Sequence, residues 1–200
     1  MDVVTTRPAN EVGWDDLEAI FGTRGDGARC WCQRYKMQPG ESWASVGREE
    51  LAFRLRQQTD CGHPRSKTTS GLVAYLDGEP VGWCAVEPRS AYPRLLLKTR
   101  VPWEGRTEDK TDNAVWAVTC VLTRVGYRRR GVSRALVRAA VDYARERGAH
   151  ALEGYPMITA PGEEIMPVEV HVGSRDAFEN AGFAEVAHPT KRRVVMRIDF

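Results

Sequence analysis

The sequence lacks any long hydrophobic run. No stretch of its 200 residues approaches the roughly 20 consecutive apolar residues that a membrane-spanning helix needs, and residues 1–10 lack the apolar segment of a secretory signal. A large excess of one charge is also missing, because 29 Lys and Arg residues are matched by 27 Asp and Glu residues. We therefore expect a cytoplasmic protein with no membrane partner and no general attraction to nucleic acids.

Internal repeats and low-complexity linkers are absent too, so we predict a single domain over residues 1–200. The five cysteines are an odd number spread through the chain, which favours reduced thiols over a disulfide framework. Cys30 and Cys32 form a C-x-C group, and Cys61 and His63 form a C-x-H group. Their spacing is not that of common zinc sites, so we predict no metal; the alternative is a zinc ion held by these four residues.

Hydrophobic periodicity predicts an α/β protein with a mixed sheet. The expected order is a strand, two helices, three strands, a helix, a strand, a helix and two strands. The segment 114–123 is apolar or small on both faces, which is typical of a central strand. The other expected strands are 3–6, a hairpin over 71–88 that turns at Asp77 and Gly78, 149–157, 183–188 and 192–200; the expected helices are 10–21, 41–60, 132 onward and 174–182; and 22–29 and 98–113 are expected loops.

Three consecutive arginines, Arg128, Arg129 and Arg130, precede the clearest helical pattern, which starts at Val132. The first turn of a helix has unpaired N–H groups and a partial positive charge, so each cation there costs about 0.3 to 1 kcal/mol. A bound anion reverses that cost, and Gly131 lets such a ligand approach the backbone. The stretch therefore predicts a diphosphate site; the alternative is three solvated arginines at a strand-to-helix turn.

The two most familiar phosphate-binding motifs are absent. No G-x-x-x-x-G-K-[ST] sequence occurs, and the glycines at 22, 25 and 27 have neither the spacing nor the preceding strand of a dinucleotide-binding loop. The stretch Arg128 to Ser133 instead resembles the acetyl-CoA signature R/Q-x-x-G-x-G/A of the GNAT superfamily of N-acetyltransferases, with Ser133 in place of Gly or Ala. AFENAGF, Ala177 to Phe183, is similar to the family's Y-x-x-x-G-F ending, and the expected element order is similar to that of the family.

The resemblance implies a GNAT fold, in which a mixed, mostly antiparallel sheet has splayed central strands and is flanked by helices. It implies acetyl-CoA as cosubstrate, with the diphosphate at Arg128 to Ser133 and the pantetheine arm beside backbone groups of Val121 and Thr123. The implied activity is direct acetyl transfer, in a ternary complex, to a primary amine of a small molecule or a protein. Homodimers are common in the family.

Two other classes of function stay open. One is a GNAT-fold module that binds acyl-CoA with little transferase activity. The other is a nucleic-acid binder that uses Arg124, Arg128 to Arg130 and Lys191 to Arg193, although exposed aromatics are not interleaved with these charges.

The catalytic groups are less well marked. The family's common base is a carboxylate on the central strand, where this chain has none, so Glu153 on the next strand is the candidate base. Apolar neighbours would raise its pKa by desolvation, and the alternative is an ion pair with an arginine. Phe178 stands where many members carry the tyrosine that protonates the leaving thiolate. Tyr155, on the same strand face as Glu153, is the candidate acid, and His171 and Ser174 are others.

The acceptor pocket is predicted from aromatic residues. In the segment RCWCQRY, Trp31 and Tyr35 would offer aromatic surface to an organic amine, and Trp103 in the long polar loop would cap the same pocket. The alternative for Trp31 is a packed core tryptophan surrounded by buried thiols.

Overall fold

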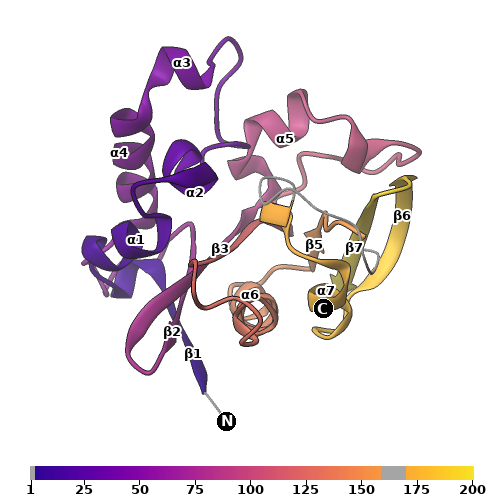
Figure 1. Ribbon diagram of the computed structural model, residues 1–200. Coiled ribbons are helices and arrows are strands. Elements are labelled where there is room, and N and C mark those ends of the chain that lie inside the picture. Colours follow the sequence, from indigo (N-terminus) through magenta and orange to yellow (C-terminus); the bar gives the residue numbers. More distant parts are fainter. Residues whose placement is uncertain (1–2, 159–169) are drawn as a thin grey trace.

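The computed structural model describes residues 3–158 and 170–200, which form a seven-stranded sheet in the order β1-β2-β3-β4-β5-β7-β6 with helices on both faces (Figure 1). Within this part of the chain, neighbouring strands pair antiparallel except β4 and β5, which are parallel. The expected mixed, mostly antiparallel sheet is confirmed. The strands are β1 (Val4–Pro8), β2 (Gly71–Leu76), β3 (Glu79–Pro88), β4 (Val115–Thr123), β5 (Ala151–Gly154), β6 (Ala184–Thr190) and β7 (Arg193–Asp199).

The helices divide between the two faces of the sheet. The α-helices are α1 (Trp14–Phe21), α2 (Gly25–Cys30), α3 (Trp43–Val46), α4 (Arg48–Thr59), α5 (Pro93–Leu97), α6 (Val132–Glu146) and α7 (Arg175–Glu179), and the 3-10 helices are η1 (Ala9–Glu11), η2 (Arg89–Ala91), η3 (Val101–Trp103) and η4 (Val170–Val172). Helices α1 to α5 lie on one side and α6 and α7 on the other (Figure 1). Each of these helices is too short or too polar to span a bilayer, as far as the described residues go.

Strand β4 is the fourth of the seven strands, as its apolar pattern predicts. Val118 and Val121 pack into the core below α6, whereas Cys120 belongs to the core on the α1 face. Ala85 pairs with Cys120 but Val86 pairs with Val118, so Thr119 is an extra residue that forms a bulge. The bulge changes the direction of β4 in its second half.

The central strands splay after four paired residues. Val115 to Val118 of β4 pair with Ala151 to Gly154 of β5, and β4 then continues to Thr123 without this neighbour. Pro156 follows β5 closely and has no N–H to donate to a ladder. The ring of Phe178 lies over Gly154, where a Cβ atom would be 2.0 Å from its Cε1. The predicted splay is therefore confirmed, and it leaves the second half of β4 without a strand partner on this edge.

Local structure differs from the sequence expectation in several helical regions. The expected helix 10–21 is divided into η1 and α1, the expected loop 98–113 contains η3, and α5 was not predicted. Gly47, with φ of 80°, divides the expected helix 41–60 into α3 and α4. Residues 25–30 form α2 where a loop was predicted, because packing of Ala28, which is 2% exposed, outweighs the low helix propensity of two glycines. The hairpin is confirmed, since Asp77 and Gly78 both have positive φ.

Candidate functional site

The turn before α6 forms a small hollow. Gly131, the N-cap residue, has φ of 79° in the left-handed region, and Arg129 also has positive φ. Such alternating turns make a concave set of N–H groups that suits anions. The hollow has a volume of about 250 Å³ and is lined by Thr123, Arg129, Gly131, Val132, Ser133 and Arg134. Ser133 is only partly buried, so a ligand can reach the first turn of the helix.

The three arginines of the signature point to different places. Arg129 lines the hollow, Arg128 lines a second, larger cavity, and the guanidinium of Arg130 lies over the ring of Tyr127 at 5.8 Å from its centroid. Arg134, which the sequence analysis did not single out, also borders the hollow and forms a 2.8 Å ion pair with Asp176. Its position in the first turn of the predicted helix was the signal that could have identified it.

The part of β4 that lacks a β5 neighbour reaches this hollow at Thr123. The Arg124 N–H donates to the carbonyl of Val81 on β3 at 2.8 Å. Because backbone groups alternate along a strand, Val121 and Thr123 direct their N–H and C=O groups to the opposite edge, where β5 has already ended. The two residues therefore have backbone groups available to an extended ligand that runs inward from the hollow.

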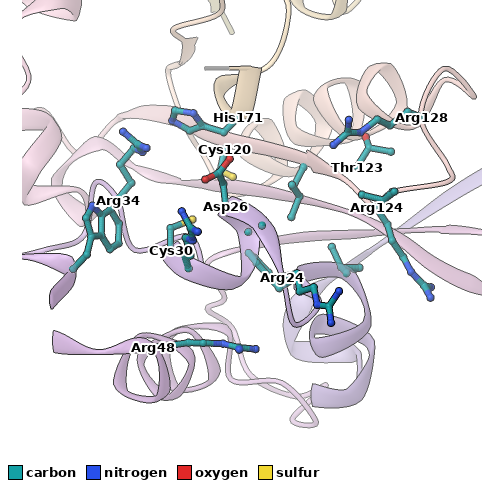
Figure 2. Close-up of a pocket in the computed structure, with 18 residues that line it drawn as sticks. Arg24, Asp26, Cys30, Arg34, Arg48, Cys120, Thr123, Arg124, Arg128 and His171 are labelled. Atoms are coloured by element: carbon teal, nitrogen blue, oxygen red, sulfur yellow. The ribbon is translucent and has the colours of Figure 1, made fainter. Parts of the chain in front are cut away.

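A larger cavity of about 720 Å³ lies between β4 and the segment that contains α1 and α2 (Figure 2). Its apolar wall includes Phe21, Cys120 and Leu122, and Thr123 borders both this cavity and the hollow. Its charged lining is mostly cationic, with Asp26 as the one carboxylate among the described lining residues. The arginines are Arg24, Arg29, Arg34, Arg48, Arg124 and Arg128.

Glu153 is fully buried but lines neither cavity. Its carboxylate accepts hydrogen bonds from Arg106, from Arg197 at 3.0 Å and from Arg89 at 3.5 Å. The same arginines contact Glu108: burial raises the pKa of Glu108, but hydrogen bonds from Arg89 and Arg106 outweigh burial and lower it below the ordinary value. This arrangement is the ion pair that the sequence left as the alternative for Glu153.

Tyr155, the first candidate acid, and Phe178, which stands where many members carry the acid, are also buried. The Tyr155 hydroxyl donates to Glu153 at 3.2 Å, and burial, followed by the charge of Glu153, raises the pKa of Tyr155 well above its usual range. Phe178 is 0% exposed and meets the Phe183 ring edge to face at a centroid distance of 5.0 Å. It lies near Val121 of the splay, because both side chains are close to Gly173. The aromatic ring is thus present beside the splay, but it carries no hydroxyl.

The predicted pocket aromatics lie in other places. Trp31 is 3% exposed and stacks between Trp14 and Phe21 at 5.4 and 5.1 Å. The Trp103 indole N–H donates to the Leu95 carbonyl at 2.8 Å in a core beneath α5. Neither Trp31 nor Trp103 is among the residues that line the cavity, so we do not carry them into the proposed site.

The segment RCWCQRY still contributes to the cavity wall, through Arg29, Cys30 and Arg34. Tyr35 lies outside the lining but faces His171, with ring centroids 6.3 Å apart. His171 does line the cavity, near Cys120 (Figure 2). Of the imidazole and acid candidates taken from the sequence, His171 is therefore the one that the structure places at the large cavity.

The thiols of the cavity wall are held in the neutral form. Burial is the largest cause that raises the pKa of Cys30 to about 11. A hydrogen bond to Cys32, together with burial, raises the pKa of Cys120 well above its usual range. Cys32 in turn accepts the indole N–H of Trp83 at 3.1 Å. Among residues 3–158 and 170–200, no three His, Cys, Asp or Glu side chains are grouped so as to hold a metal ion.

Comparisons with known proteins agree on one family. The model of the acetyltransferase (GNAT) family matches residues 31–155, which is more than half of the chain. The ribosomal-protein-alanine N-acetyltransferase of Brucella melitensis is 17% identical, with a TM-score of 0.53 over 98% of this chain and 99% of its own. YncA of Salmonella typhimurium, solved with its cofactor acetyl-CoA, is 14% identical, with a TM-score of 0.52 over 98% and 93%.

A third solved structure is similar over nearly its whole length. The aminoglycoside acetyltransferase AAC(6')-Ib, solved in complex with coenzyme A, is 20% identical, with a TM-score of 0.50 over 98% of this chain and 95% of its own. At these identities the likeness concerns the fold. No sequence among the curated proteins matches the chain.

Proposed function

Because the chain belongs to the GNAT acetyltransferase family, we propose that it transfers an acetyl group from acetyl-CoA to a primary amine. One observation carries the proposal: Thr123, at the end of the β4 segment that has no β5 neighbour, lines both the hollow at the start of α6 and the large cavity. A diphosphate, an extended thioester arm and an acceptor thus have adjoining places.

Acetyl-CoA fits the first two places through groups of this chain. The diphosphate would lie against the first-turn N–H groups of α6, with Arg129 and the Ser133 hydroxyl as further donors. The pantetheine amides would pair with backbone groups of Val121 and Thr123 as an added strand does. Their directions along β4 follow from the Arg124 to Val81 hydrogen bond.

The reaction joins the amine nitrogen to the thioester carbonyl carbon. The carbon–sulfur bond breaks, CoA leaves as a thiolate, and the extra proton of the amine passes to a base. In this proposal the N–H of Val121 would donate to the carbonyl oxygen as its negative charge develops. An alkylammonium has a pKa of about 10, so a base is needed to supply the neutral amine near pH 7.

We assign the base to His171 rather than to Glu153. His171 lines the cavity where the amine would enter, and imidazole is the side chain that titrates nearest neutrality. Glu153, by contrast, is engaged by three guanidinium groups and lines neither cavity. Tyr155 donates to Glu153, so its hydroxyl is directed away from the thiolate that would leave.

A second function has one observation in its favour. Phe178 supplies no hydroxyl beside the splay, and β4 has no carboxylate. Both features are expected of a module that binds acyl-CoA without efficient transfer. A thiolate is a good leaving group even unprotonated, so transfer does not depend on an acid at position 178.

The test is a transfer assay with isotopically labelled acetyl-CoA and a panel of amines, read by mass spectrometry. The transferase predicts a labelled amide on at least one amine. It also predicts that His171→Gln lowers kcat by about 10²- to 10⁴-fold and removes the acidic limb of the pH–rate profile, with the Kd of CoA unchanged. Tight binding of CoA with no amide from any amine would refute the transferase and favour the binding module.

A further inference from the structure

The large cavity has an unbalanced charge. Six arginines line it, Arg24, Arg29, Arg34, Arg48, Arg124 and Arg128, whereas Asp26 is the one described carboxylate in the lining. Four of the six come from α2 and its flanking segments and from α4, across the cavity from β4 (Figure 2). An excess of guanidinium groups around one hollow raises the local concentration of anions.

Most of these arginines do not form ion pairs within the described residues. Arg124 is 3.6 Å from Glu79, and Arg48 donates only to the carbonyl oxygens of Thr23 and Gly22, at 3.3 and 3.4 Å. No carboxylate of the part of the chain that the structure describes pairs with the other four. The contrast is internal: the buried arginines around Glu153 have carboxylate partners, whereas those around the cavity do not.

Arg34 is the best placed of these groups to bind a ligand. It is partly buried, and its side chain lies at the same end of the cavity as His171 (Figure 2). Partial burial strengthens a charge-assisted hydrogen bond, and a guanidinium matches carboxylate and phosphate oxygens with two parallel donors. Asp26 extends from α2 toward β4 (Figure 2), where it suits the ammonium group of an incoming amine.

We infer that the acceptor is an amine that also carries an oxyanion, a carboxylate or a phosphate, which the cavity arginines bind, with Arg34 as the principal donor. The inference rests on the proposed transferase function. Asp26 and His171 receive the amino end of the acceptor while the oxyanion lies among the guanidinium groups. Amines without an oxyanion, including polycationic amines, lack the negative group that the arginines of this cavity would bind.

The rival explanation is that the arginines bind the phosphates of CoA itself. It applies most readily to Arg124 and Arg128, which follow β4 and lie near the hollow. Arg34 comes from the opposite wall, so its loss should affect the acceptor and spare the cosubstrate. The two explanations therefore differ in which binding constant changes.

The experiment compares matched acceptors. Phosphoethanolamine is paired with ethanolamine, and phenylalanine is paired with phenylalaninamide, each with saturating acetyl-CoA. The amide's amino group is less basic and more often neutral, so a preference for the free acid would not come from amine reactivity. We expect kcat/KM for phosphoethanolamine or for phenylalanine to exceed that of its neutral partner by about 10- to 100-fold. This range corresponds to one to two charge-assisted hydrogen bonds. Which of the two pairs shows the preference distinguishes a phosphate site from a carboxylate site.

Variants then locate the effect. Arg34→Gln should raise the KM of the preferred acid about tenfold or more, leave its neutral partner unchanged and leave the Kd of CoA unchanged. Arg34→Lys, which keeps the charge but not the two parallel donors, should lie in between. Arg65→Gln is the matched control, because Arg65 is exposed, lies outside the cavity and forms no ion pair or side-chain hydrogen bond with the described residues.

Three results would overturn the inference. They are equal or better turnover of the neutral partners, a preference for polycationic amines, or a Kd of CoA that rises in Arg34→Gln while the acceptor KM does not. If no amine is acetylated at all, the transferase function fails first. Calorimetric titration with inorganic phosphate and with succinate then tests the cavity without any reaction. Weaker binding of these anions to the Arg34→Gln variant than to the Arg65→Gln variant would support an oxyanion site. Equal binding to the two variants would refute it.

Discussion

Replacing Gly131 by glutamate places a carboxylate at the proposed diphosphate site. A Cβ atom built on Gly131 meets nothing within 4 Å, so the new side chain has room, but its backbone φ of 79° disfavours any residue other than glycine. The left-handed conformation costs about 1 to 2 kcal/mol for a residue with a Cβ. Gly131→Glu is therefore expected to lower both the stability of the fold and its affinity for CoA.

The electrostatic part of the loss is estimated from Coulomb's law. Two unit charges 4 Å apart interact by about 4 kcal/mol at an effective dielectric constant of about 20 and by about 1 kcal/mol in water. The hollow borders solvent, because Gly131 and Arg129 are exposed. A repulsion of about 2 kcal/mol is expected between these limits, which corresponds to roughly a 30-fold increase in the Kd of CoA.

Gly131→Ala is the matched control for backbone strain. It has the same unfavourable φ as Gly131→Glu but no charge, so it should lose stability with little change in the Kd of CoA. Calorimetric titration with CoA and with pantetheine, which lacks the diphosphate, isolates the charge effect. A diphosphate at α6 predicts weaker binding of CoA alone; equal Kd values of CoA for the Glu and Ala variants, or equal losses for CoA and pantetheine, would refute the reasoning.

Three further predictions concern other parts of the fold. Glu153→Gln removes the buried carboxylate that Arg89, Arg106 and Arg197 share and leaves them Glu108 as a partner, so the free energy of unfolding should fall by about 1 to 3 kcal/mol in urea titrations; unchanged stability with lost turnover would instead make Glu153 the base. Gly82→Ala puts a Cβ 2.6 Å from Val132 Cγ1 in the first turn of α6, so stability should fall by about 1 to 3 kcal/mol and CoA binding should weaken, whereas Gly13→Ala, with nothing within 4 Å, should change neither. Because burial raises the pKa of Cys30 from 9.0 to about 11, its thiolate is scarce below that pH, and iodoacetamide at pH 8 should alkylate it about 100-fold more slowly than a thiol with a pKa of 9; mass spectrometry of the labelled peptide would contradict this by showing equal rates.

The sheet and its splay were largely predictable from the sequence. The segment 114–123 is apolar on both faces, and such a strand must be covered on both sides, so its central position follows. Asp77 and Gly78 determined the hairpin through their preference for positive φ. The interruption at Gly47 was harder to predict, because a single glycine inside a helical pattern is often tolerated.

The cavity walls were not predictable, since they depend on which side chains meet in space. Trp31 and Cys30 are neighbours in sequence, yet Trp31 packs into the core and Cys30 faces the cavity. Glu153 had apolar sequence neighbours, but its environment is set by Arg106 and Arg197, which are distant in the chain. The periodicity of a strand predicts which face of the sheet a side chain lies on. It does not predict which charged side chains from other elements will contact it.

The most direct test of the account is the thermal unfolding of the protein with CoA, ATP or NAD at equal concentrations. Site occupancy at 100 times the Kd adds about 2.7 kcal/mol to the stability, which for a chain of this size raises the Tm by roughly 5 to 10 °C. The account predicts a rise of this size with CoA and a smaller one or none with ATP and NAD. A Tm that rises with ATP or NAD but not with CoA would contradict it.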